Sequence, residues 1–72
     1  MTRWEYRFVQ VTPYHIAISI NDQNLNEPYP SVWDIANNLG LDGWELVGIE
    51  NGSENSIAMY VFKREIDIDE RN

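Results

Sequence analysis

Few side chains in this sequence are of the types that perform catalytic or metal chemistry. The chain has one histidine, His15, and no cysteine. A nucleophilic triad would therefore have a single available base, and neither a disulfide framework nor a Cys/His zinc site can form. His15 stands near Pro13 in a β-favouring stretch, where a surface histidine satisfied by its local surroundings is the ordinary interpretation. The sequence predicts no catalytic residue, no metal site and no cofactor.

Carboxylates and glycines form no stronger motif. Asp42 and Glu45 could divide acid and base roles only in a buried environment, which nothing in the sequence predicts. Asp67 and Asp69 make an Asp-x-Asp pair, but the further oxygen ligands, the glycine and the final glutamate of a calcium loop are missing. The four glycines fit neither a Walker nor a dinucleotide-binding pattern. We expect a protein that is not an enzyme.

Length and charge limit the classes of partner. Seventy-two residues make one domain, close to the lower size limit at which a core holds a chain folded. Five basic and twelve acidic residues give a net charge of −7, which repels phosphate backbones and anionic lipids. We therefore expect neither nucleic acid nor membrane as a partner. An alternative function that the acidic charge allows is that of a decoy, which mimics DNA and occupies a DNA-binding protein.

The N-terminal segment and the overall hydropathy predict where the protein resides. Arg3, Glu5 and Arg7 interrupt the first residues, so the apolar core of a signal peptide is missing. No stretch approaches the roughly 18 apolar residues of a membrane span. We expect a soluble, cytoplasmic protein with a compact domain at residues 1–64 and an acidic, disordered tail at residues 65–72.

Hydrophobic periodicity predicts an α+β domain. A period of two indicates strands, and apolar residues at i, i+3, i+4 and i+7 indicate a helix. Ser31 is the expected N-cap of this helix, and Gly40 is its expected left-handed C-terminal residue. The expected elements are strands at 4–11, 14–20, 44–50 and 57–64, a helix at 31–39 and a loop at 21–30. We predict an antiparallel sheet of three to four strands with the first strand central and paired with the last, and with the short helix packed on one face.

Apolar residues on both faces of the predicted sheet indicate that the protein has a partner. In the first strand, Trp4, Tyr6 and Phe8 alternate with charged residues and are expected to face inward. In the last hairpin, an even-length turn groups Trp44 and Leu46 with Ile57, Met59 and Val61, and Val47 and Ile49 with Ala58, Tyr60 and Phe62. One short helix covers only one face, so the second apolar face must also leave water. We expect a homodimer through that face, with cover by the loop at 21–30 and the tail as the alternative.

Aromatic side chains are the remaining candidates for a binding site. A ligand groove, if present, is expected between the sheet and the loop at 21–30. The candidate interface or ligand groove comprises Tyr14, Tyr29, Trp33, Val47, Ile49, Tyr60 and Phe62, of which the first three would line the groove. The predicted function is a non-catalytic, homo-oligomeric interaction module, and a small-molecule-binding domain with an aromatic groove is an alternative.

Three stretches, taken in order, resemble a known family. They read Trp-Glu-Tyr-Arg at residues 4–7, Asn-Leu-Gly-Leu-Asp-Gly-Trp-Glu-Leu-Val at residues 38–47 and Val-Phe-Lys-Arg at residues 61–64. This arrangement is similar to the small bacterial family of unknown function DUF4177, and also to DUF1737, over the first strand and from the helix onward. The resemblance implies a compact β/α domain with no assigned activity, cofactor or catalytic residue. It does not extend over residues 13–30.

Overall fold

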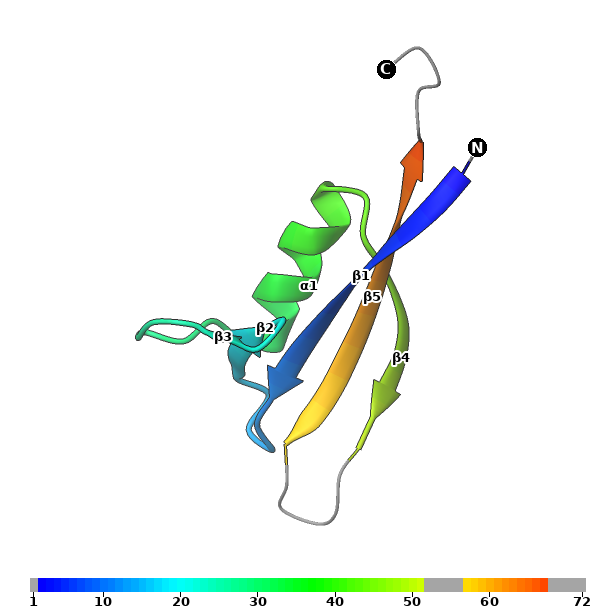
Figure 1. The fold of residues 1–72 in the computed structure, drawn as a ribbon. Helices are drawn as coiled ribbons and strands as arrows, with labels where there is room; N and C mark the ends of the chain where they lie inside the picture. The colour runs from blue at the N-terminus through cyan, green and yellow to red at the C-terminus, as the bar shows by residue number, and fades with distance from the viewer. Residues whose placement is uncertain (1, 52–56, 68–72) are drawn as a thin grey trace.

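The structure, a computed structural model, describes residues 2–51 and 57–67 (Figure 1). These residues form one antiparallel sheet of five strands, in the order β3-β2-β1-β5-β4, and one helix. The elements are β1 (Thr2–Val11), β2 (Ala17–Ile20), β3 (Gln23–Asn24), α1 (Val32–Leu41), β4 (Glu45–Glu50) and β5 (Ala58–Asp67). The predicted α+β class, with one short helix and an antiparallel sheet, is confirmed.

The first strand is central, as predicted. β1 lies between β2 and β5 and pairs with β5 along its whole length, starting with Thr2 opposite Asp67. The predicted count of three to four strands is too low, because Gln23 and Asn24, inside the expected loop, pair with β2. The tail predicted at 65–72 begins too early, because residues 65–67 continue β5. Residues 68–72 lie outside the described part of the chain.

β2 is shorter than the strand predicted at 14–20. After β1 ends, the backbone of Thr12 accepts a hydrogen bond from His15 N and donates one to Ile16 O, both at 2.9 Å. His15 has a φ of 65°, which lies outside the β region. Regular pairing with β1 therefore begins only at Ala17.

Helix α1 begins where the sequence predicts and ends two residues later. The Ser31 hydroxyl accepts a hydrogen bond from Asp34 N at 3.2 Å, which confirms the N-cap. The predicted C-terminal residue, Gly40, lies inside the helix, which ends at Leu41. The left-handed conformation falls instead on Gly43, with a φ of 89°, at the turn that leads into β4.

The core lies between α1 and one face of the sheet. Its buried sheet residues include Val9, Val11 and Phe62, and its buried helix residues are Val32 and Leu39. Figure 1 shows α1 lying alongside β1 and β2, with β4 at the far edge of the sheet. The helix therefore covers one face of the central strands and leaves the outer part of β4 uncovered.

The prediction that the aromatic residues of β1 face inward is wrong. Trp4, Tyr6 and Phe8 are 46, 50 and 44 % exposed, whereas Val9 and Val11 are buried. Side chains alternate along a strand, so the two valines and the aromatic residues occupy opposite faces. The helix packs on the valines, and the aromatic residues consequently face away from it.

A bulge in β4 also changes the predicted faces of the last hairpin, although Ile49 shares a face with Tyr60 as predicted. Leu46 lies opposite Phe62, but Gly48, and not Val47, lies opposite Val61. The extra residue shifts the side-chain alternation by one position, so the predicted grouping of Leu46 with Val61 is wrong. The helix-side face of this hairpin comprises Trp44, Leu46, Ile49, Ala58, Tyr60 and Phe62.

Candidate functional site

The face of the sheet that α1 does not cover carries a row of aromatic side chains. Trp4, Tyr6 and Phe8 follow one another along β1, and Phe8 lies opposite Val61 on β5. Met59 lies on the same face, because residues directly opposite each other in an antiparallel pair share a side and Met59 is opposite Gln10. We call the surface formed by Trp4, Tyr6, Phe8, Met59 and Val61 the open face.

The open face is hollowed at one end. A depression of about 340 Å³ is lined by Tyr6, Phe8, Asn21, Asp22 and Met59. Asn21 is fixed beside Phe8 by two hydrogen bonds, in which its backbone N donates to Phe8 O at 2.8 Å and its Oδ1 accepts from Phe8 N at 2.9 Å. The turn after β2 thus holds one wall of the depression in place.

Charges of both signs border the aromatic row. Lys63 lies opposite Tyr6 on β1 and opposite Glu45 on β4, so all three side chains point to the open side. The Lys63 Nζ atom lies 4.4 Å from the centroid of the Trp4 ring, a cation–π distance. Glu65 lies opposite Trp4 on the same side. This rim presents one cation between two carboxylates.

The residues predicted to form an uncovered face do not form one, because Ile49, Tyr60 and Phe62 share the helix side of the sheet. Phe62 is 2 % exposed in the core and Tyr60 packs against that core, so both lie beneath the chain's own helix. Val47 and Ile49 are exposed on β4, which is the outermost strand of the sheet. The open face was not predicted from the sequence. The pattern that indicates it is the alternation along β1, in which Trp4, Tyr6 and Phe8 stand at even positions and Val9 stands at an odd one.

The three residues predicted to line an aromatic groove are all exposed. Tyr14 is 85 % exposed in the turn after β1. Trp33 is on α1, where its ring lies 5.0 Å from that of His15. Tyr29 is in the segment before the helix. None of the three lines the depression on the open face, and none lines a second pocket that lies beside Arg7 on the helix side of the sheet.

A second group of charged and aromatic side chains lies on the helix side of the sheet, around Trp44. The guanidinium carbons of Arg7 and Arg64 lie 4.7 and 4.6 Å from the centroid of this buried indole. Arg64 donates from Nη2 to Glu5 Oε2 at 2.8 Å, an ion pair that joins β5 to β1. Two cations thus share one aromatic ring, and one carboxylate pairs with one of them.

Comparison of the chain with protein-family models, curated proteins and solved structures found no match. The resemblance to DUF4177 stays a prediction. Among the residues that the structure describes, no helix has the length and apolar character needed to cross a membrane. The same residues contain no group of three or more His, Cys, Asp or Glu side chains arranged to hold a metal ion.

Proposed function

We propose that this protein is a non-catalytic interaction module that forms a homodimer through the open face. The observation that carries the proposal is the row of three aromatic side chains, Trp4, Tyr6 and Phe8, each about half exposed on the uncovered side of the sheet. Aromatic residues at such exposure are characteristic of the central part of protein interfaces. A contiguous apolar surface on a small domain marks a site that another surface covers.

The exposed aromatic area sets the expected strength of association. A buried aromatic side chain covers roughly 150–250 Å², so three half-exposed rings leave roughly 200–350 Å² per copy. At about 25 cal/mol per Å², burial of this area gains about 5–9 kcal/mol for each copy. Association costs about 4–15 kcal/mol. Since a standard interface covers about 800 Å² of each partner, Met59, Val61 and the charged rim must also be buried, and we expect a micromolar dimer.

The charges at the rim favour a second copy as the occupant. In a two-fold dimer the same surface meets itself, so each charge must find its opposite on an identical patch. Lys63 stands between Glu45 on the neighbouring strand and Glu65 two residues along β5. A copy rotated by two-fold symmetry can place the cation of one chain against a carboxylate of the other.

Sedimentation velocity between about 1 and about 200 µM tests the proposal directly. We expect the mass to rise toward twice the 8.5 kDa of the chain as concentration increases. Tyr6→Glu should shift the protein to monomer, because a dimer would bury the new carboxylate. In the monomer this substitution is tolerated, since position 6 lies opposite Lys63. A weakening of dimerisation by at least about 30-fold is expected, equivalent to about 2 kcal/mol.

Tyr14→Glu is the matched control, because it makes the same chemical change at an exposed residue in the turn after β1. It should dimerise as the unmodified chain does. A monomer at all concentrations would refute the proposal. Equal loss of the dimer in both variants would show that net charge, rather than the open face, governs association.

A further inference from the structure

Arg7 is a partly buried cation on the helix side of β1. Its guanidinium stacks on Trp44 at 4.7 Å, which orients its planar fork. In residues 2–51 and 57–66, no carboxylate lies within ion-pair distance of Arg7, whereas the neighbouring Arg64 is paired with Glu5. A guanidinium remains charged at any physiological pH. Arg7 therefore keeps its full hydrogen-bonding capacity for an anion from solution.

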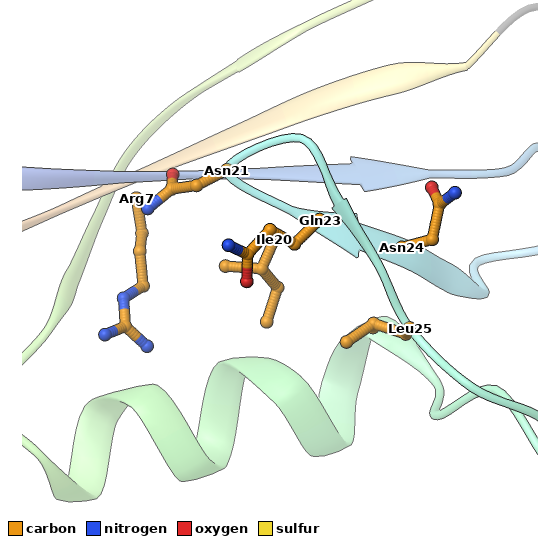
Figure 2. A pocket seen from close by; sticks show the side chains of 6 residues that line it. All are labelled: Arg7, Ile20, Asn21, Gln23, Asn24 and Leu25. Carbon is orange, nitrogen blue, oxygen red and sulfur yellow. The ribbon is translucent and has the colours of Figure 1, made fainter.

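A pocket opens beside this guanidinium. It has a volume of about 360 Å³ and is lined by Arg7, Ile20, Asn21, Gln23, Asn24 and Leu25. Figure 2 shows the side chains of Arg7, Ile20 and Leu25 extending toward helix α1, with the Gln23 amide between Arg7 and Ile20 in this view. The space is within the size range of small-molecule sites. It lies between the sheet and the helix, on the side opposite the open face.

The polar groups of the pocket are suited to an anion. The lining contains one cation, three amides and no acid. The Oδ1 atom of Asn21 already accepts a hydrogen bond from Phe8 N at 2.9 Å, which leaves the Asn21 amino group as a donor. Gln23, which lies opposite Ile20, supplies a further amide that can donate, whereas the Asn24 amide points away from Arg7 (Figure 2). An anion in this pocket would meet donors in an environment without a competing carboxylate.

The apolar lining and the overall charge narrow the class of anion. Ile20 and Leu25 form an aliphatic wall beside the guanidinium. A single cation balances one negative charge, and the net charge of −7 opposes the approach of a polyanion. We propose that this pocket binds a small organic monocarboxylate, with its carboxylate on the Arg7 guanidinium and its aliphatic body against Ile20 and Leu25. The planar guanidinium matches a carboxylate in two-pronged geometry.

A titration with 3-methylbutanoate tests the site, followed by ¹H–¹⁵N correlation spectra of the intact chain at constant ionic strength. We expect saturable shifts of the backbone amides of residues 20–25 and of the Arg7 Nε–H, with a dissociation constant on the order of 1 mM for so small a ligand. The uncharged 3-methylbutanamide has the same shape and should bind at least about tenfold more weakly, because it lacks the charge-assisted hydrogen bonds. Inorganic phosphate should also bind more weakly.

Two substitutions separate the site from the fold. Arg7→Gln should abolish saturable binding, but it also removes the stacking on Trp44. Gln23→Glu changes an exposed side chain of the pocket and should weaken carboxylate binding by about tenfold through repulsion. Asn37→Asp makes the same amide-to-carboxylate change on an exposed helix residue outside the pocket lining and should bind as the unmodified chain does.

Three outcomes with the unmodified chain would overturn the proposal. The first is the lack of a saturable shift up to about 20 mM 3-methylbutanoate, which is twentyfold the expected dissociation constant. The second is that 3-methylbutanamide binds as tightly as 3-methylbutanoate, and the third is that phosphate does so. Equal weakening by Gln23→Glu and Asn37→Asp would likewise contradict a site at Arg7. Asn21 lines both this pocket and the depression on the open face, so the shift of the Arg7 Nε–H on the helix side is the signal that separates carboxylate binding from dimerisation.

Discussion

Arg64 connects three parts of the fold through a single side chain. Its Nε and Nη2 atoms donate to Glu5 Oε2 at 3.0 and 2.8 Å, and its Nη1 donates to the carbonyl oxygen of Asp42 at 3.1 Å. Its guanidinium carbon also lies 4.6 Å from the Trp44 ring centroid. Arg64→Gln should therefore lower the free energy of unfolding by more than the loss of one surface ion pair would.

The contacts of Arg64 set the expected loss in the free energy of unfolding. The Arg64 and Glu5 side chains each keep 35 % exposure, so solvent screening limits their ion pair to at most about 1 kcal/mol. The hydrogen bond to the Asp42 carbonyl adds about 1 kcal/mol, and the stacking on Trp44 adds about 0.5 kcal/mol. We expect Arg64→Gln to cost about 2–2.5 kcal/mol. Glu5→Gln should cost about 1 kcal/mol or less, because the other two contacts of Arg64 remain.

Urea denaturation followed by far-ultraviolet circular dichroism measures these costs. The two single variants and the double variant are compared at one protein concentration, because association would add to the apparent stability. The coupling between Glu5 and Arg64 should be about 1 kcal/mol and should shrink in about 0.5 M salt. The rest of the Arg64→Gln effect should persist in salt. An Arg64→Gln cost equal to that of Glu5→Gln would refute the connecting role of Arg64.

Local backbone requirements give two further predictions, both measured as melting temperatures, where about 1 kcal/mol corresponds to about 4–8 °C for a domain of this size. Gly43→Ala should destabilise the fold by about 1 kcal/mol or more, because Gly43 has a φ of 89° and an added Cβ would contact Arg64 Cδ at 3.5 Å. Gly40 lies inside the helix with no atom within 4 Å of an added Cβ, so Gly40→Ala should stabilise the fold by up to about 1 kcal/mol. Equal effects of the two substitutions would contradict this assignment. Ser31→Ala should cost about 1 kcal/mol through loss of the bond to Asp34 N, while Ser31→Asp should retain most of the stability; an Asp variant as unstable as the Ala variant would show that the cap contributes little.

Local sequence patterns predicted most elements of this fold and part of their order. The alternation around Trp4 to Val11 and the helical spacing after Ser31 both predicted the observed elements, because each reflects the burial of one face. The central position of β1 was also predicted. The extra short strand at Gln23–Asn24 was not, because two exposed polar residues carry no hydrophobic period.

The faces of the strands required long-range information. Trp4, Tyr6 and Phe8 are the larger apolar side chains of β1, but the helix packs on the smaller Val9 and Val11. On the face of the valines, Glu5 pairs with Arg64, which is distant in sequence, and no local pattern reveals this contact. In β4, the bulge inserts one residue at Val47, and a single insertion exchanges the two faces of everything beyond it. The adjacent glycine, Gly48, was the only local sign of an irregular strand.

The distribution of the few cations connects the two proposals. In a chain with a net charge of −7, carboxylates are abundant enough to pair with any cation whose role is only to stabilise the fold. Arg64 has such a partner in Glu5, whereas Lys63 lies over the Trp4 ring on the open side, opposite Glu45. Arg7 stacks on the same indole as Arg64, yet in the part of the chain that the structure describes no carboxylate reaches it, and the lining of its pocket contains no acid. A cation held in this way by an acidic protein is suited to bind an anion that the chain itself does not supply, so the two sides of one sheet can serve different partners.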